Sequence, residues 1–219
     1  MSQNFTGRND DIEIPIPSET DRISLFPLHP KIYCLMVRRK ILFCDNSLRE
    51  LLNFRKEIIC HYASNGYDVV LVAPQNMDIY QWEFPNIRFT PVIMNRSGTN
   101  PIEDMKYFFR LKRIYTEEKP DYIFHYTIKP NIYGTFAAKS CGIRSSAMIA
   151  GLGYVFSRKN IPNKIARYLY KAALRYSEYV LVLNKSNRDF LIDRKIVPRE
   201  KIILLSGGEG VNLNHFQIE

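Results

Sequence analysis

Short apolar segments alternate with longer amphipathic segments from residue 40 onward, and this alternation restricts the possible folds more than any other feature of the chain. Apolar segments with the length and composition of buried strands lie at residues 40–45, 68–73, 87–90, 122–125, 147–150, 179–183 and 201–205. Helical patterns lie between them at residues 48–65, 101–118, 131–141, 162–176 and 186–193. The sequence therefore predicts an α/β fold, with a parallel sheet of about seven strands and helices on both faces.

Residues at the ends of these segments fit the predicted boundaries. Gly66 and Gly142 follow helical segments, at positions where glycine accepts a positive φ. Pro101 suits the first turn of its helix, and Ser186 has the side chain of an N-cap for the short helix that follows. Pro130 disfavours the helical conformation for the residue before it, so we expect Lys129 in an extended turn that faces a crevice.

The first 35 residues lack this alternation. They contain four prolines and little periodicity, which predicts a disordered N-terminal extension over residues 1–35. Met36 stands just before the first strand and is expected to be the natural start, which N-terminal sequencing of protein from its own locus would test. A chain of 219 residues is too short for two such domains, so we expect one domain over residues 36–210 and the start of a linker over residues 211–219.

Composition excludes several classes of protein. Apolar residues make up 46% of the chain and charged residues 24%, which is typical of a globular domain. The four cysteines lack the spacing of a metal site and are expected to be buried thiols in a reducing compartment. No apolar run has the length of a membrane span or the pattern of a signal peptide. We therefore expect a cytoplasmic protein with at most peripheral membrane contact.

The net charge of +9 indicates an anionic partner, such as nucleic acid, acidic lipid headgroups or a phosphorylated substrate. Nucleic acid is not expected, because the basic residues are interspersed with acids and no recognition motif accompanies them. One predicted helix carries a basic stripe that recurs every three or four residues: Lys164, Arg167, Lys171 and Arg175. This stripe fits contact with the headgroups of an anionic membrane, and a solvated helix face is the alternative.

Ligands of such sheets bind beyond the carboxyl ends of the strands, so the loops after the strands are the places to look for a site. The loop after the first strand lacks the G-x-G-x-x-G pattern, which weighs against a dinucleotide, and no cofactor or metal is predicted. Asn46 and Ser47 in this loop could bond the hydroxyls or phosphate of a ligand. A simple capping role for them is the alternative.

The loop after the fourth strand is the most informative. His125 ends this strand and could act as a general base near neutral pH, or it could be a buried structural residue. Tyr126 and Thr127 follow it, and Lys129 could bind a phosphate or be a solvated charge.

Two further loops carry glycines. Gly151 and Gly153, before Tyr154, could let the backbone approach a ligand or could simply form a tight turn. A glycine-rich stretch follows the last strand and, in isolation, has the composition of a linker; it includes Gly207, Gly208, Glu209 and Gly210.

Several of these segments, taken in order, are similar to those of a known family. They are KILFCDNS at residues 40–47, YTIKPNIYG at 126–134, AGLGYVF at 150–156, LNKSNRDFLI at 183–192 and VPREKI at 197–202. Together they resemble the N-terminal domain of family-4 glycosyltransferases, specifically the bacterial members of capsular polysaccharide, lipopolysaccharide and exopolysaccharide biosynthesis. The resemblance spans about residues 40–216.

The resemblance implies one half of a GT-B fold, in which two Rossmann-like domains face each other. The N-terminal half receives the sugar acceptor, and the other half holds the nucleotide sugar. Relatives of this type transfer a sugar with retention and without a required metal, often to an undecaprenyl-diphosphate-linked acceptor at the inner membrane surface. The donor half is missing from this sequence, so a separate donor-domain subunit is an expected partner and the chain alone should be inactive.

The resemblance also implies where ligands bind. The residues expected to line the acceptor side are Asn46, Ser47, His125, Tyr126, Thr127, Lys129, Gly151, Gly153 and Tyr154. The glycine-rich stretch from Gly207 to Gly210 would cross to the donor side, although Asn212 stands where relatives have an aspartate. Many relatives have a histidine at the position of Tyr126, and His125 points to the other face of the strand, so the resemblance identifies no catalytic residue.

Other functions stay open at this point. A non-catalytic module that binds a polyprenyl-diphosphate sugar, or that tethers a partner enzyme to the membrane, would share the same features. A dehydrogenase is disfavoured, because the glycine fingerprint after the first strand is absent.

Overall fold

The computed structural model describes residues 39–75, 84–96, 100–152 and 161–205. The predicted N-terminal extension and linker, Met36, Gly153, Tyr154 and the stretch from Gly207 to Gly210 lie outside these residues.

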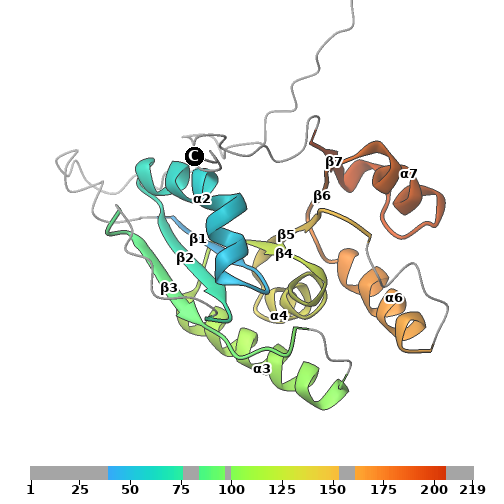
Figure 1. Ribbon diagram of the computed structural model, residues 1–219, viewed down its shortest axis with the longest axis horizontal. Helices are drawn as coiled ribbons and strands as arrows, with labels where there is room; N and C mark the ends of the chain where they lie inside the picture. The colour runs from blue at the N-terminus through green and yellow to red at the C-terminus, as the bar shows by residue number, and fades with distance from the viewer. Residues whose placement is uncertain (1–38, 76–83, 97–99, 153–160, 206–219) are drawn as a thin grey trace, which may run out of the picture. The chain divides into compact units, whose positions relative to one another are not determined.

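The strands form a single parallel sheet in the order β3-β2-β1-β4-β5-β6-β7 (Figure 1). Its strands are β1 (Lys40–Cys44), β2 (Asp68–Ala73), β3 (Ile87–Pro91), β4 (Tyr122–Tyr126), β5 (Arg144–Ile149), β6 (Val180–Val182) and β7 (Ile202–Leu204). The chain moves outward from β1 to β3, then returns to pair β4 with the other side of β1. This topology is Rossmann-like and confirms the predicted fold class.

Helices lie on both faces of the sheet, as Figure 1 shows. The helical elements are α2 (Leu48–Ser64), α3 (Pro101–Glu118), η2 (Pro130–Gly134), α4 (Thr135–Ser140), α6 (Ile161–Leu174), α7 (Lys185–Asp193) and η3 (Arg199–Lys201). α2 lies on one face, and α3, α4 and α6 lie on the other.

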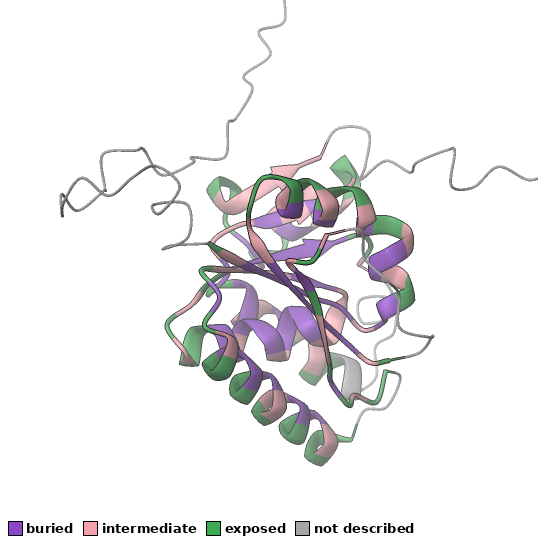
Figure 2. Cartoon of the chain, turned by 90° about the vertical axis from the view of Figure 1, so that its left-hand side faces the viewer, coloured by how far each residue is buried: buried purple, intermediate pink, exposed green. Residues whose placement is uncertain are grey.

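Alternation along the strands builds a separate core on each face. Phe43 and Leu71 pack under α2, whereas their neighbours Leu42 and Val70 pack against α3. A further cluster joins β5 and β6 to α6 and α7. The buried stripes of the helices turn toward the sheet in Figure 2. The inner strands are buried on both faces, which explains their continuous apolar sequence.

Several predicted boundaries are confirmed and several are wrong. Gly66 and Gly142 have φ values of 83° and 71° at helix ends, and Pro101 opens α3. The N-cap of α7 is Asn184 rather than Ser186, because the Asn184 side chain accepts the backbone N–H of Asn187.

β5 begins at Arg144, earlier than predicted. Its first residues include the serines 145 and 146, whose polar side chains hid a buried strand. Ser146 is satisfied by a hydrogen bond with the hydroxyl of Tyr122 on β4, at 2.5 Å. A buried polar residue with a partner on the neighbouring strand is compatible with the core.

Candidate functional site at the carboxyl edge of the sheet

The loops after β1, β4 and β5 come together because these strands are neighbours at the centre of the sheet. The sequence of strands changes direction between β1 and β4, and ligands of open α/β sheets bind at such a switch point. A hydrogen bond joins the two loops there, since the hydroxyl of Thr127 lies 3.3 Å from the Asp45 carboxylate. This edge is the candidate site.

Asp45 is the residue at this edge that the sequence analysis missed. Its side chain is buried directly after β1, and burial raises its pKa to about 6. The backbone N–H of Asn46, the charge of Arg55 and the hydroxyl of Thr127 oppose that rise. An acidic residue placed immediately after the apolar residues 41–44 of a central strand is the sequence signal that could have identified it.

Asn46 and Ser47 divide into two roles. Ser47 is buried and caps α2, because its hydroxyl accepts the backbone N–H of Glu50 at 3.3 Å. The capping alternative therefore describes Ser47. Asn46 is half-buried at the edge, where its side-chain oxygen accepts a hydrogen bond from Arg96 at 3.4 Å. Arg96 follows β3, so Asn46 links the candidate site to the loop after β3.

Thr127 has an unusual backbone conformation. Its φ is 66°, in the left-handed region that β-branched residues avoid. Such a conformation costs about 1–3 kcal/mol and persists where the surrounding structure fixes it, often at functional sites. The hydroxyl of Thr127 donates toward the carbonyl of Tyr126 and toward Asp45. Thr127 is only half-buried, so it can meet a ligand at this edge.

Tyr126 lies under α2 instead of facing the edge. Its ring is buried, stacks against Phe43 at a centroid distance of 6.3 Å and lies 4.5 Å from the guanidinium carbon of Arg55. This ring packs as part of the core, and contact with a ligand would need it to move.

His125 points to the opposite face, as strand alternation requires, and is buried between the sheet and the helices. Its ring nitrogens lie 3.0 Å from the hydroxyl of Tyr115 and 3.4 Å from that of Thr135. Burial lowers the pKa of His125 to about 3, so the imidazole is neutral near pH 7. The structural alternative for His125 agrees with this environment, whereas a general base would need access to the edge.

The expected conformation of Lys129 is wrong. Its φ and ψ are −68° and −47°, so it is helical, and a π-helical turn, η2, follows. Its ammonium forms an ion pair with Asp104 of α3 at 2.6 Å, and Tyr133 donates to the other oxygen of Asp104 at 2.9 Å. Lys129 therefore binds α3 and does not face a crevice. The preference of a residue before proline for an extended backbone takes no account of a distant partner, and here Asp104 is such a partner for Lys129.

Gly151 follows β5 and is exposed, and no atom lies within 4 Å of the position that a Cβ would take. The structure leaves open space at this glycine, on the same edge as the loops after β1 and β4.

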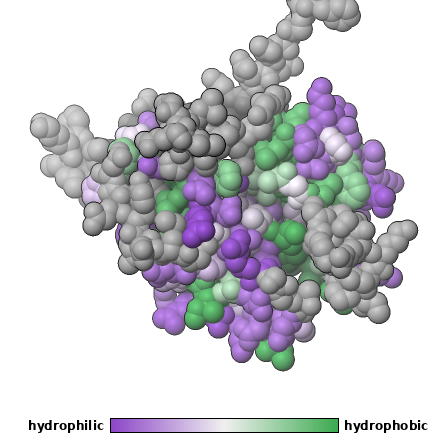
Figure 3. Space-filling view, viewed as in Figure 1, coloured by the Kyte–Doolittle hydropathy of each residue, from purple (hydrophilic) through white to green (hydrophobic). Residues whose placement is uncertain are grey.

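Three residues of the basic stripe lie on α6, and Arg175 follows directly after the helix, which ends at Leu174 rather than at the predicted residue 176. Lys164 and Arg175 are exposed, and Arg167 and Lys171 are half-buried. Large apolar side chains stand beside them in solvent, since Ile165 is 57% exposed and Tyr168 is 75% exposed. Figure 3 shows hydrophobic and hydrophilic residues mixed on the face that it presents.

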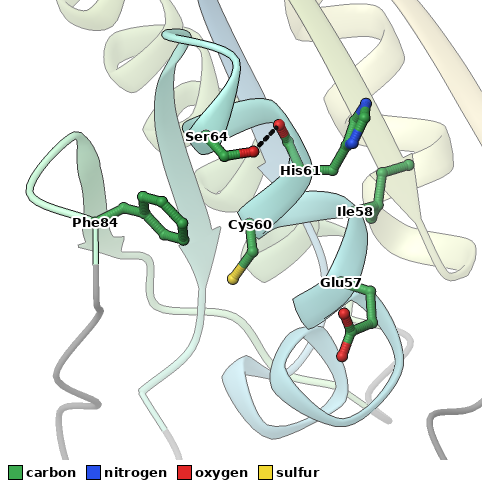
Figure 4. Close-up of a pocket in the computed structure, with 6 residues that line it drawn as sticks. All are labelled: Glu57, Ile58, Cys60, His61, Ser64 and Phe84. Atoms are coloured by element: carbon green, nitrogen blue, oxygen red, sulfur yellow. Dashed lines mark hydrogen bonds between the residues drawn. The ribbon is translucent and has the colours of Figure 1, made fainter.

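A pocket of about 580 Å³ lies elsewhere, between the second half of α2 and Phe84. Figure 4 shows Glu57, Cys60, His61 and Ser64 of α2 on one side of it and Phe84 on the other. α2 begins at the carboxyl edge and ends at the opposite edge, so this pocket is separate from the candidate site.

Cys44 is buried, and Cys60 and Cys141 are half-buried free thiols. Within the residues that the structure describes, no group of three or more His, Cys, Asp or Glu residues could hold a metal ion. In the same residues, no helix has the length and apolar character needed to cross a bilayer.

The model of one protein family, described as glycosyl transferase 4-like, matches residues 40–184. The chain belongs to this family. The match covers β1 to β6 and the three loops of the candidate site. The family resemblance inferred from the sequence motifs is therefore confirmed.

The chain also has a curated relative. The chain is 25% identical over 184 residues to the N,N'-diacetylbacillosaminyl-diphospho-undecaprenol alpha-1,3-N-acetylgalactosaminyltransferase of Campylobacter jejuni. The match covers 81% of this chain and 48% of the relative, so the chain spans about half the length of that transferase.

Solved structures share the fold. A UDP-N-acetylglucosamine 2-epimerase from Rickettsia bellii superposes with a TM-score of 0.58 at 20% identity, over 79% of this chain and 46% of the epimerase. A glycosyltransferase from Rickettsia africae superposes with a TM-score of 0.56 at 15% identity, over 82% of this chain and 45% of that protein. The sheet and its helices thus match half of a GT-B fold.

Proposed function

We propose that this domain is the acceptor-binding half of a retaining glycosyltransferase of surface-polysaccharide synthesis. In this proposal a sugar passes from a nucleotide sugar to a saccharide carried on undecaprenyl diphosphate. The observation that carries the proposal is the polar edge formed by the loops after β1, β4 and β5, within the segment that matches the family.

The Campylobacter relative supports the class of acceptor. Its name specifies an amino sugar linked through diphosphate to undecaprenol. A ligand of this kind presents hydroxyl and amide groups next to an anionic diphosphate. Asn46 and Thr127 offer hydrogen-bonding groups for the sugar, and Arg96 stands next to Asn46 with a charge suited to the diphosphate.

Transfer requires a second half that binds the nucleotide sugar. In the proposal this donor half is contributed by polypeptide outside this sequence, as a further domain or a separate subunit. The domain alone supplies only part of the surroundings of the transition state, so it should bind acceptor without turning it over.

Calorimetry with two probes tests this assignment. We expect the full chain to bind farnesyl-diphosphate-linked N-acetylglucosamine, a short-chain substitute for the lipid-linked acceptor, and to show no heat of binding with UDP-N-acetylglucosamine. Binding of the nucleotide sugar without the lipid-linked sugar would contradict the proposal, because it would make the domain a donor half.

We propose in addition that α6 rests on the anionic membrane surface where such an acceptor resides. The four basic residues of the stripe would meet lipid headgroups, and Ile165 and Tyr168 would enter the interface between headgroups and acyl chains. α3 lies on the same face of the sheet and adds exposed Ile102, Met105 and Phe109.

Vesicle sedimentation tests the membrane contact. We expect the chain to sediment with phosphatidylcholine vesicles that contain phosphatidylglycerol, and the double variant Arg167→Glu and Lys171→Glu to lose most of this binding. The matched control is the double variant Arg49→Glu and Lys56→Glu on α2, across the sheet from α6, which reverses the same number of charges and should sediment as the wild type does. Equal loss in the control would show that the contact depends on net charge rather than on α6.

A further inference from the structure

Asp45 occupies the centre of the candidate site without being open to solvent. It follows β1 at the switch point, and its carboxylate oxygen accepts the backbone N–H of Asn46 at 2.6 Å and the hydroxyl of Thr127 at 3.3 Å. Both donors lie at the edge of the sheet that forms the candidate site, and both are half-buried. Asp45 therefore connects the loops after β1 and β4 from the buried side of the edge.

The hydrogen bonds of Thr127 determine what its oxygen can do. A hydroxyl has one proton to donate and two lone pairs that accept. The proton of Thr127 faces acceptors within the protein, namely Asp45 and the carbonyl of Tyr126. The oxygen is then left to accept a hydrogen bond from a ligand at the edge.

The backbone of Thr127 supports a functional role. A threonine at a φ of 66° is strained, and glycine or asparagine would fit that conformation better. A π-helical turn begins only three residues later, at Pro130, and such turns are frequent at functional sites. A strained threonine at this position is explained if its hydroxyl contributes to ligand binding.

We infer that Asp45 is a positioning residue, which fixes the Thr127 hydroxyl as a hydrogen-bond acceptor for a hydroxyl or amide N–H of the acceptor sugar. This inference rests on the proposed function and adds the contact that would recognise the sugar. It assigns Asp45 no direct contact with the ligand, in agreement with its burial.

A comparison of two probes isolates the sugar contact. The full chain is titrated with farnesyl-diphosphate-linked N-acetylglucosamine and with farnesyl diphosphate, which lacks the sugar. Thr127→Gly should weaken binding of the sugar-linked probe about tenfold, the effect of one lost hydrogen bond, and should leave farnesyl diphosphate unchanged. Asp45→Ala should weaken binding of the sugar-linked probe with the same selectivity but by a smaller factor, because the carbonyl of Tyr126 still accepts the Thr127 proton.

Thr127→Ser is the matched control, since it keeps the hydroxyl and should bind the sugar-linked probe within about twofold of the wild type. Thermal unfolding separates positioning from a structural role. Thr127→Gly relieves the backbone strain and should unfold at the wild-type temperature or above it, even though it binds the sugar less well.

Three outcomes are distinguishable. If the wild type binds neither probe, the proposed function fails. If the wild type binds the sugar-linked probe and both variants bind it equally well, the function stands and the role of Asp45 and Thr127 is refuted. Equal weakening of both probes in step with lost thermal stability would also refute it, because that pattern belongs to a purely structural contact.

Discussion

Two buried side chains at the ends of neighbouring strands have pKa values shifted in opposite directions. Burial raises the pKa of Asp45 from 3.8 to about 6 and lowers that of His125 from 6.5 to about 3. The folded protein thus binds the Asp45 proton more tightly than the unfolded chain does, and the His125 proton less tightly. Protonation of Asp45 stabilises the fold, and protonation of His125 destabilises it.

Asp45→Asn should be more stable than the wild type at about pH 7, by about 1–3 kcal/mol. The ionised carboxylate destabilises the folded wild type. The wild type therefore loses stability progressively as pH rises from about 4 to about 6. Urea unfolding at about pH 4 and about pH 7 measures the difference, which should vanish at the lower pH. A difference that is the same at both pH values would contradict the assigned burial.

His125→Gln tests the opposite sign. The wild type should lose stability as pH falls from about 6.5 toward about 3, because the unfolded chain takes up a proton that the buried imidazole refuses. The variant should be less stable by about 1–3 kcal/mol at neutral pH, since two buried hydrogen bonds change, but its loss below about pH 6 should be smaller. Urea titrations across this range give both values.

Gly134 allows the buried histidine to sit where it does. A Cβ at this position would lie 2.5 Å and 2.6 Å from atoms of the His125 ring and 3.2 Å from the Tyr115 hydroxyl. Gly134→Ala should therefore cost about 1–3 kcal/mol of unfolding free energy. Gly151→Ala, which meets open space, is the control and should change stability by less than about 0.5 kcal/mol in the same denaturation assay.

At the scale of helices and strands, Asp104 joins α3 to η2 by accepting both Lys129 and Tyr133. The ion pair is mostly shielded from solvent, with 13% and 12% of the two side chains exposed. Shielding leaves Lys129 poorly solvated if Asp104 is removed, so the pair holds the start of η2 in place.

Asp104→Ala should destabilise the protein by about 2–4 kcal/mol, because it leaves a shielded lysine and a tyrosine hydroxyl without their acceptor. Glu103→Ala, one position earlier on the same helix, removes an exposed pair with Lys106 and should cost much less stability than Asp104→Ala. Thermal unfolding of the two variants makes the comparison. Equal effects would mean that the Asp104 contacts are solvated.

The sequence predicted β1 and β2 well because, after a charged first residue, each of them is buried on both faces and apolar. It failed where a distant partner decides the local conformation. Lys129 is helical and its ammonium pairs with Asp104 of α3, and the buried Ser146 of β5 has the hydroxyl of Tyr122 as its partner. Such contacts join residues far apart in the chain, and local pattern does not contain them.

The sequence predicted the loops of the candidate site, but it did not predict all the contacts that their side chains make. The loops after β1, β4 and β5 follow directly from strand order, and the structure brings them together. Which side chains face the edge depends on packing: Ser47, His125 and Lys129 have partners inside the protein, whereas Asn46 and Thr127 stay at the edge. Asp45 was not predicted because its raised pKa comes from burial, which the residue type alone does not indicate.

At the scale of the whole molecule, the site exists only where β1 and β4 meet. Asp45 and Thr127 belong to different halves of the sheet, and one ladder between β1 and β4 sets their distance. A ligand bound at this edge would hold both halves of the sheet at once, and the unfolded chain would not bind it.

Farnesyl-diphosphate-linked N-acetylglucosamine should therefore raise the unfolding temperature of the chain. A concentration about one hundred times its dissociation constant corresponds to about 2.7 kcal/mol of added stability. Scanning fluorimetry over a series of concentrations would measure the shift, with Thr127→Gly as the variant expected to need more probe. An unfolding temperature independent of the probe would contradict binding at this edge.

The strand order also has a consequence for how the chain reaches its native state. β1, β2 and β3 are sequence neighbours on one side, and β4 to β7 are sequence neighbours on the other, so each group can assemble from local pairings. The pairing of β1 with β4, in which Ile41 lies opposite Tyr122, forms only after the long loop between these strands has closed. We therefore expect it to be a slow step. Recovery of sugar binding during refolding would then follow the joining of the two groups of strands, later than the return of helical signal.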